Sequence, residues 1–133
     1  MILVKTKIGP SKVHGIGLFA DQFIPKGTVT FEYTPSFDVS FTKEEIEKMP
    51  KITQDYLIFY TYFDKKRNKY VLCSDNQRFI NHTDDINKMN IKSTPDQDVA
   101  IRDIQPGEEF LCNYNDFDDT YFDRMGYTKE KLN

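Results

Sequence analysis

The sequence predicts a single β-rich domain, built from many short strands with only modest helix. The chain has 133 residues, the size of one compact domain, and contains no internal repeat or long linker. Its hydrophobic fraction is only 38%, but 11 Phe and 8 Tyr can bury a large area per residue and so form a core. Short runs of β-branched and aromatic residues alternate with turn signals along the chain, which favours an all-β or β-rich α+β domain.

The first third of the chain predicts short strands separated by turns. Residues 1–7 alternate weakly between apolar and polar side chains until Gly-Pro-Ser at 9–11 interrupts them. Residues 16–20 form a short apolar run after a glycine-containing turn. Pro-Lys-Gly at 25–27 predicts a tight turn, and residues 28–33 predict the strand that follows it.

The middle third predicts one short helix and several aromatic strands. Thr42 and Glu45 have the spacing of a capping box, so we expect a helix from there to about Met49, ended by Pro50. The aromatic run at 56–63 predicts a strand, although a run so uniform also allows a helix. After a polar turn at 64–68, residues 70–73 predict a second strand, and residues 75–81 predict one or two helical turns.

The last third predicts two more strands and an aromatic tail. Residues 98–102 and 109–114 are the strands, and Gln-Pro-Gly at 105–107 is the turn between them. Phe117, Tyr121 and Phe122 follow at positions that a helix could place on one face.

Cysteine and histidine content limits the possible sites. Cys73 and Cys112 are too few for a four-thiolate zinc site, and we expect both to be small buried hydrophobes. His14 and His82 are the only histidines, which excludes a multi-histidine metal site. The sequence shows neither a signal peptide nor a stretch of about 20 apolar residues, so a soluble, intracellular protein is the default expectation.

Net charge argues against a nucleic-acid binder, because the formal charge is −3 and the pI about 5.4. The charge is unevenly distributed, since residues 75–123 contain 12 acidic and 4 basic side chains. Such a segment is either a solvated face or a surface that attracts a basic partner, and charge alone leaves both possibilities open.

Four stretches contain residues suited to chemistry, and each of them alone is more commonly structural. His-Gly-Ile-Gly at 14–17 would let the backbone approach a ligand or another strand closely. Asn and His end the sequence Arg-Phe-Ile-Asn-His at 78–82, Gly-Glu-Glu occupies 107–109, and Tyr114 ends a predicted strand. No serine stands in a nucleophile-elbow setting, which gives a Ser/His/Asp hydrolase little support.

The order and spacing of these stretches resemble the SET-domain protein lysine methyltransferases. Gly-Ile-Gly-Leu-Phe-Ala, Arg-Phe-Ile-Asn-His, Ala-Ile-Arg-Asp-Ile-Gln-Pro-Gly-Glu-Glu and a strand-end Tyr follow one another across residues 8–122. The resemblance implies a β-clip-like SET fold of several small curved sheets around a knot-like core, where the Asn-His and Tyr segments pass close together. Residues 1–133 would then form a single SET domain, with 42–73 as a variable insert and 115–133 as a short C-terminal tail.

The resemblance also implies the activity, which is transfer of a methyl group from S-adenosylmethionine to a lysine side chain of a protein, without a metal. Tyr114 matches the catalytic tyrosine and also contacts the donor. The backbone of Gly15, Ile16 and Gly17 would approach the methionine part of the donor, where a side chain would block the approach. Asn81 would hydrogen-bond the amino group or carboxylate of the donor.

The adenine of the donor would be held by two parts of the chain. By the same resemblance, the His82 backbone would meet the adenine, and one aromatic residue of the tail would stack on it. The candidates for stacking are Phe117, Tyr121 and Phe122.

The sequence departs from the family pattern at several positions. Thr83 and Asp84 replace the frequent Ser-Cys after Asn-His, no cysteine cluster follows Tyr114, and Asn113 replaces an Asp. Cys112 stands where the family often has Phe or Tyr, and its smaller volume predicts room for di- or trimethylation.

The expected partner is a lysine-containing basic protein such as a histone, attracted by the acidic segment, with neither nucleic acid nor membrane bound directly. The lack of flanking domains resembles minimal stand-alone viral and bacterial members of the family, some of which form homodimers. Two alternatives are a SET-fold module that binds a peptide without turnover, and a structural β-domain whose glycine and Asn-His elements are only turns and caps.

Overall fold

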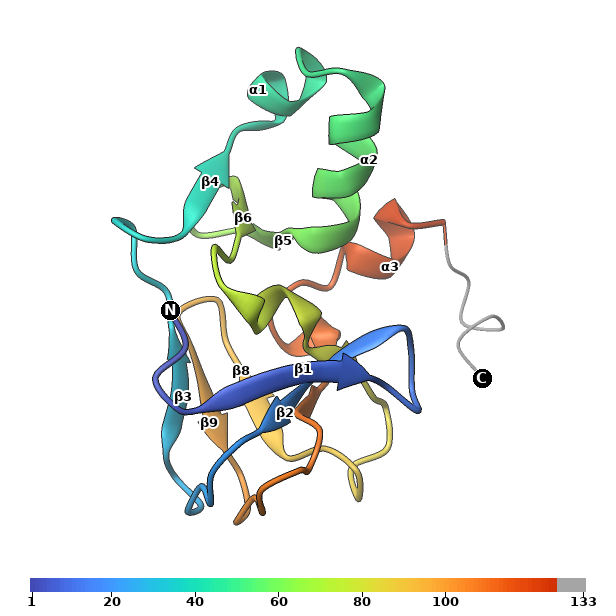
Figure 1. The fold of residues 1–133 in the computed structure, drawn as a ribbon. Helices are drawn as coiled ribbons and strands as arrows, with labels where there is room; N and C mark the ends of the chain where they lie inside the picture. Colours follow the sequence, from blue (N-terminus) through green and yellow to red (C-terminus); the bar gives the residue numbers. More distant parts are fainter. Residues whose placement is uncertain (127–133) are drawn as a thin grey trace.

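Four small sheets, none of more than three strands, form the framework of residues 1–126, which are the residues that the computed structural model describes (Figure 1). One antiparallel pair joins β1 (Thr6–Pro10) to β2 (Ile16–Ala20). An antiparallel sheet has the order β3 (Val29–Glu32), β9 (Gln97–Ala100), β8 (Ile91–Ser93). A parallel pair joins β7 (Asn81–His82) to β10 (Leu111–Cys112). The predicted β-rich architecture of several small sheets is thereby confirmed.

The fourth sheet belongs to a separate upper lobe, which lies at the top of Figure 1. It has the order β4 (Val39–Phe41), β6 (Lys69–Leu72), β5 (Tyr62–Asp64), and two helices connect β4 to β5. These helices are α1 (Lys43–Glu47) and α2 (Lys51–Tyr60). The predicted capping box is present at α1, where Thr42 Oγ1 accepts from the Glu45 N–H and the Glu45 carboxylate accepts from the Thr42 N–H.

The strand predicted at 56–63 is wrong for most of its length, because α2 continues to Tyr60 and only β5 is extended. The aromatic side chains of this run are spaced for a helix. The rings of Tyr56 and Tyr60, one turn apart, lie 4.7 Å from each other, and Leu57 faces the interior. Pro50 lies directly before the first residue of α2, a position at which no hydrogen bond within the helix needs its missing N–H. It therefore favours the start of α2 as well as the end of α1.

The predicted interruption of the first strand at 9–11 is also wrong, because β1 continues through Gly9 to Pro10. Gly9 lies directly opposite Gly17 in the β1–β2 register, so two residues without side chains pair across the hairpin. Pro10 ends the strand, a position where the ladder does not need its N–H. Of residues 1–5, only Ile2 makes a strand-like bridge, with Phe31.

Most of the remaining elements lie close to their predicted positions, but the strand predicted at 109–114 is longer than the observed strand, β10, and Tyr114 begins a 3₁₀ turn after it. The turns at 25–27 and 105–107 are present, with Gly27 and Gly107 both at φ +89°. The helical prediction at 75–81 corresponds to a single 3₁₀ turn, η1 (Asn76–Phe79), capped by the Asp75 carboxylate. The tail contains a second 3₁₀ turn, η2 (Tyr114–Asp116), and α3 (Tyr121–Arg124).

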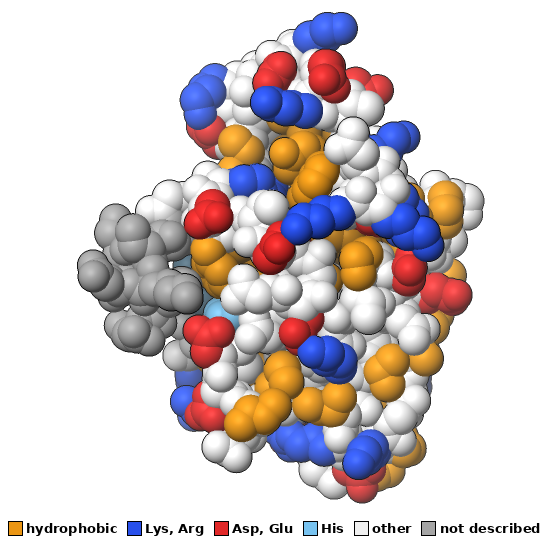
Figure 2. All heavy atoms as spheres, turned by 180° about the vertical axis from the view of Figure 1, so that it is seen from behind, with side chains coloured by type: hydrophobic (Ala, Val, Ile, Leu, Met, Phe, Trp, Pro, Cys, Tyr) orange, Lys and Arg blue, Asp and Glu red, His pale blue; other side chains and the backbone are white. Residues whose placement is uncertain are grey.

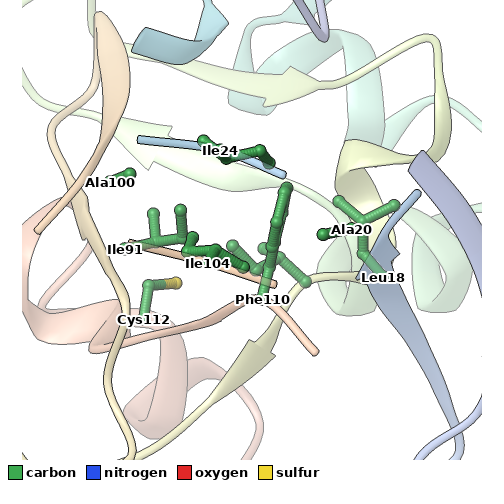
Figure 3. Packing of buried hydrophobic residues seen from close by; sticks show 9 residues of the cluster. Leu18, Ala20, Ile24, Ile91, Ala100, Ile104, Phe110 and Cys112 are labelled. Atoms are coloured by element: carbon green, nitrogen blue, oxygen red, sulfur yellow. The ribbon is translucent and has the colours of Figure 1, made fainter. Parts of the chain in front are cut away.

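A hydrophobic core lies among the three sheets below the upper lobe (Figure 3). It consists of nine buried residues from β2, β8, β9, β10 and the loops between them: Leu18, Ala20, Ile24, Ile80, Ile91, Ala100, Ile104, Phe110 and Cys112. Both segments of the parallel pair contribute a residue to this core, because Ile80 directly precedes β7 and Cys112 is the last residue of β10. Packing therefore fixes the two segments that contain Asn81 and Tyr114.

Both cysteines are free and buried, as predicted, and burial raises the pKa of each thiol. Within residues 1–126, no group of three or more His, Cys, Asp or Glu residues could hold a metal ion. No helix in this part of the chain is long and apolar enough to cross a membrane. Of the predicted tail, residues 127–133 lie outside the described residues.

Candidate active site

A cavity of about 490 Å³, a size typical of ligand pockets, lies among the predicted site residues. Three separate parts of the chain meet around it: the loop between β1 and β2, the segment from Arg78 to β7, and the tail. The end of α2 closes it with Phe59 and Tyr60. Seven of the predicted site residues line the cavity: Gly15, Ile16, Asn81, His82, Tyr114, Tyr121 and Phe122.

Asn81 connects two of these parts through its side-chain amide. Its Nδ2 donates to the carbonyl oxygens of His14 at 2.9 Å and Ile16 at 3.1 Å, and to the Glu109 carboxylate at 3.0 Å. Because all three partners are acceptors, they fix which end of the amide is the nitrogen. The amide oxygen is then left without a donor among the described residues, on a side chain that lines the cavity.

Glu109 occupies the space beside the glycine loop. A Cβ atom at Gly17 would lie 2.3 Å from its Oε1 and 2.8 Å from its Cδ. Gly17 therefore makes room for the carboxylate that holds Asn81, and it does not line the larger cavity. The predicted approach of the Gly17 backbone to the donor stays a prediction, since the atoms that approach Gly17 in this structure belong to Glu109. Gly15 has a different role, because its φ of +49° is one that glycine adopts most easily.

His82 links β7 to Tyr114 through its ring. The backbone N–H of Tyr114 donates to His82 Nδ1 at 3.0 Å, so the ring hydrogen lies on Nε2, which donates to the Asp84 carboxylate at 3.1 Å. Burial lowers the pKa of His82 below its usual value of 6.5, and the Asp84 carboxylate only partly opposes this effect. The ring is therefore neutral at physiological pH, and its unprotonated Nδ1 fixes the start of η2.

Tyr114 lies where the two chain segments cross. Its hydroxyl donates to the carbonyl oxygen of Ile80 at 2.5 Å, and burial raises its pKa well above 10. The hydroxyl therefore remains protonated, with its hydrogen directed at Ile80 and its lone pairs available to accept.

The tail aromatics gather around Tyr114. The rings of Tyr121 and Phe117 meet it edge-on, at 5.0 Å and 5.8 Å, and Phe122 stacks on it at 5.9 Å. Phe122 also meets the His82 ring edge-on at 4.7 Å. Phe117 differs from the other two, because it packs against the core and does not line the larger cavity.

Contacts with the upper lobe hold the tail in this position. The Tyr121 hydroxyl donates to the carbonyl oxygen of Phe59 at 2.9 Å, which fastens α3 to α2. The buried Asp118 carboxylate accepts from the Phe63 N–H at 2.8 Å and pairs with Arg124. The tail is therefore held against α2 and β5 beside the larger cavity.

A second, smaller cavity of about 60 Å³ adjoins the first. Six residues line both cavities: Phe59, Tyr60, Arg78, Ile80, Tyr114 and Tyr121. The other residues that line the smaller cavity include three aromatic ones, Phe31, Tyr62 and Phe117, and the buried polar side chains of Gln77, Ser93 and Asp98. Tyr114 therefore stands at the boundary between a large cavity and a smaller one with both aromatic and polar walls.

Sequence reasoning missed the polar residues of the smaller cavity and the aromatic residues at the end of α2. Asp98 and Gln77 lie within ordinary strand and turn patterns, and Phe59 and Tyr60 lie in the run for which the sequence predicts a strand. Cys112 is fully buried in the core and lines neither cavity, so its small side chain does not enlarge either of them.

Residues 75–123 present fewer unpaired acidic side chains than their composition indicates, because several of these side chains form ion pairs. Lysines pair with Asp116 at 2.9 Å and with Asp119 at 2.8 Å, and Arg102 pairs with Glu108 at 3.0 Å. On the face that Figure 2 shows, acidic and basic side chains lie interspersed. The solvated-face interpretation thus accounts for part of the segment.

Comparison with known proteins identifies a family over most of the chain. The family model of the SET domain matches residues 15–115. Among solved structures, a humanized mutant of the Chaetomium thermophilum Polycomb Repressive Complex 2, bound to an inhibitor, is similar at 24% identity and a TM-score of 0.64, over 90% of this chain and 16% of that one. A candidate histone methyltransferase of Plasmodium falciparum is similar at 24% identity and a TM-score of 0.59, over 85% of this chain and 95% of that one.

A third similar structure is an autoinhibited form of Polycomb Repressive Complex 2 bound to S-adenosylmethionine, at 22% identity and a TM-score of 0.63, over 92% of this chain and 16% of that one. This chain thus spans about a sixth of the Polycomb chains that it matches. No curated protein sequence matches it. At these identities the structural likenesses show a shared fold.

Proposed function

Because this chain belongs to the SET-domain family, whose model matches residues 15–115, we propose that it is a protein lysine methyltransferase that uses S-adenosylmethionine. The observation that supports this most is the position of Tyr114 between the two cavities, beside the Asn-His segment. The larger cavity is the proposed donor site, and the smaller one is the proposed channel for the lysine side chain.

The residues of the larger cavity fit an amino-acid and nucleoside ligand. The Asn81 amide donates to the protein, so its oxygen is the end that can accept from the ammonium group of the methionine part. Phe122, edge-on to the His82 ring at 4.7 Å, is the tail aromatic best placed to stack on an adenine near the His82 backbone. Phe117 is less suited to this role, because it lies on the smaller cavity.

The chemistry of methyl transfer explains why a small cavity with several aromatic residues in its wall is useful. When bound, the donor supplies a methyl group on a positively charged sulfonium, and the lysine nitrogen must present a free lone pair to it. For a lysine of ordinary pKa, about 10.4, deprotonation at neutral pH costs on the order of 4–5 kcal/mol of free energy. An aromatic channel that excludes water lowers this pKa, because it destabilises the charged form.

Tyr114 can position the amine in this scheme, and it cannot act as a base. Its raised pKa keeps the phenol protonated, and its hydrogen is committed to the Ile80 carbonyl. The free lone pairs of the hydroxyl can accept a hydrogen bond from the incoming amine and so hold it in line with the methyl group. Its contribution is then orientation and electrostatic stabilisation.

The substrate that we propose is a lysine-containing basic protein, with histones as the first candidates. The support comes from the family and from the structural neighbours, which include a candidate histone methyltransferase. The acidic side chains of residues 75–123 that are not paired with cations would attract such a substrate.

Donor binding and methyl transfer together test the proposal. Calorimetry with S-adenosylmethionine should show binding, and radiolabelled donor should transfer label to lysines of purified core histones or of proteins in a cell lysate. Binding without transfer to either would favour a module that recognises a peptide without turnover. Absence of donor binding would contradict the proposed site whatever the fold.

A further inference from the structure

Asp98 is a buried acid on the wall of the smaller cavity that the scheme above does not use. It lies on β9 with only 4% of its surface exposed. Its two polar neighbours are neutral, since Gln77 Nε2 donates to its Oδ2 at 2.5 Å and Ser93 lies beside it. Among the described residues, no Lys, Arg or His forms an ion pair with this carboxylate.

The charged and titratable groups around Asp98 do not supply a counter-ion. The amino group of Met1 pairs with a different carboxylate, that of Asp38, at 3.2 Å. Arg78 lines the same cavity, but its guanidinium lies 5.1 Å from the centre of the Phe79 ring and forms no ion pair within residues 1–126. The nearby Cys73 and Cys112 thiols are held neutral by burial.

A buried carboxylate without a cation is energetically unfavourable, and proteins resolve this either by protonation or by a bound cation. Burial raises the pKa of Asp98 to about 7, so near neutral pH the group is close to half ionised. Asp98 and Tyr114 both line the smaller cavity, in which we have placed the substrate lysine. The cation that this cavity would receive during turnover is the ε-ammonium group of that lysine.

We propose that the Asp98 carboxylate pairs with the ammonium group of the substrate lysine in the smaller cavity and accepts its proton before methyl transfer. The inference rests on the proposed function. One N–H bond of the ammonium breaks and one O–H bond forms on Asp98, while the electron pair stays on nitrogen as the lone pair that attacks the methyl carbon. The proton returns to solvent from Asp98 when the product leaves, which completes the balance.

The test compares Asp98→Asn with a matched control, Asp38→Asn, in the full chain. Both variants replace a carboxylate that is 4% exposed, but Asp38 lines neither cavity. Asparagine keeps the shape of Asp98 and an oxygen that can accept from Gln77. Donor affinity is measured by calorimetry with S-adenosylmethionine, and methyl transfer to purified core histones is followed from pH 6.5 to pH 9.5.

We expect Asp98→Asn to lower kcat at least tenfold at pH 7.5, with donor affinity within about twofold of wild type. The loss should shrink as the pH approaches the ordinary lysine pKa of about 10.4, because solvent then removes the proton. Asp38→Asn should keep the wild-type pH profile. Equal kcat values for Asp98→Asn and wild type at every pH would overturn the inference and leave the proposed function intact. If wild type labelled no core histone, the same comparison would use the labelled proteins of a cell lysate, and absence of transfer to both would mean that the proposed function fails and the inference with it.

Discussion

Replacing Gly17 by Ala should disturb the candidate donor site through Glu109, while the same change at Gly9 should not. The two glycines are direct partners in the β1–β2 ladder, and neither has a positive φ. A Cβ at Gly17 would lie 2.3 Å from Glu109 Oε1, whereas a Cβ at Gly9 would meet only Phe19 Cε2, at 3.8 Å. Gly9→Ala is therefore a matched control in the same hairpin.

The expected loss of stability in Gly17→Ala follows from the hydrogen bond that Glu109 makes to Asn81. Its carboxylate can swing away from the new methyl group, but it then releases the Asn81 amide that it holds at 3.0 Å. A hydrogen bond to a charged group contributes about 1.5–3 kcal/mol, and overpacking that is not relieved costs about 1–3 kcal/mol. Because the Asn81 amide keeps the carbonyl oxygens of His14 and Ile16 as acceptors when Glu109 moves away, we expect a loss at the lower end of these ranges, about 1–2 kcal/mol, and a thermal midpoint lower by roughly 3–10 °C. Gly9→Ala should be neutral or stabilising by up to about 1 kcal/mol.

A double-mutant cycle with Glu109→Ala separates this explanation from a general effect of adding a methyl group. Without the Glu109 carboxylate, the nearest atom to the new Cβ at residue 17 is Ser11 Cβ at 3.1 Å, so the two contacts under 3 Å are gone. The cost of Gly17→Ala by denaturant unfolding should then fall by at least about 1 kcal/mol. Affinity for S-adenosylmethionine should fall in Gly17→Ala and not in Gly9→Ala. The same cost in both backgrounds, or equal costs for the two glycines, would refute the reasoning.

Three further predictions concern single side chains. For His82, the pKa in the folded state lies below 6.5. The unfolded chain therefore takes up a proton at a higher pH than the folded protein does, and the free energy of unfolding falls as the pH drops from 6.5 through the folded-state pKa. Thermal midpoints between pH 7.5 and 5 should therefore drop more in wild type than in His82→Asn, which keeps an acceptor for the Tyr114 N–H, and parallel curves would contradict this. For Asp98, a folded pKa of about 7 against 3.8 means that stability is lost as pH rises from 3.8 to 7, by up to about 4 kcal/mol. Denaturant unfolding at pH 8 should give Asp98→Asn a larger free energy of unfolding than wild type, and this difference should vanish near pH 4. A smaller free energy of unfolding for the variant at pH 8 would show that burial does not destabilise the charged form of Asp98. Phe122→Ala should weaken binding of S-adenosylmethionine and S-adenosylhomocysteine by the same factor of about ten in calorimetry, because both contain adenine, and a loss confined to one of them would exclude stacking on the base.

The order of short motifs was enough to predict which segments meet at the site. The segments of Asn81 and Tyr114 lie side by side in β7 and at the end of β10, as the family resemblance implied. Their detailed partners depend on packing between distant strands, so the sequence could not show that Asn81 is held by Glu109. The burial of Asp98 beside Gln77 had no sequence signal either, because a single acid in a short strand is usually exposed.

The wrong strand at 56–63 has a physical reason in the sequence itself. Aromatic residues favour strands only when their neighbours fit a pleated surface, and here the spacing of Tyr56 and Tyr60 suits a helix face. Lys51 and Asp55 form an ion pair four residues apart in the same helix. The position of Pro50 directly before this periodic run was the signal that could have identified α2.

The most direct test of the account is methyl transfer from radiolabelled S-adenosylmethionine to core histones by wild type and by Tyr114→Phe, side by side. The substitution removes only the hydroxyl that donates to Ile80 and leaves the aromatic packing with Tyr121 and Phe122 in place. We expect wild type to label lysine, and Tyr114→Phe to retain donor affinity within about threefold while transfer falls about 100-fold, or about 2.7 kcal/mol of lost transition-state stabilisation. Equal labelling by the two proteins would contradict the role of Tyr114, and donor binding with no labelling by wild type would contradict catalysis on histones.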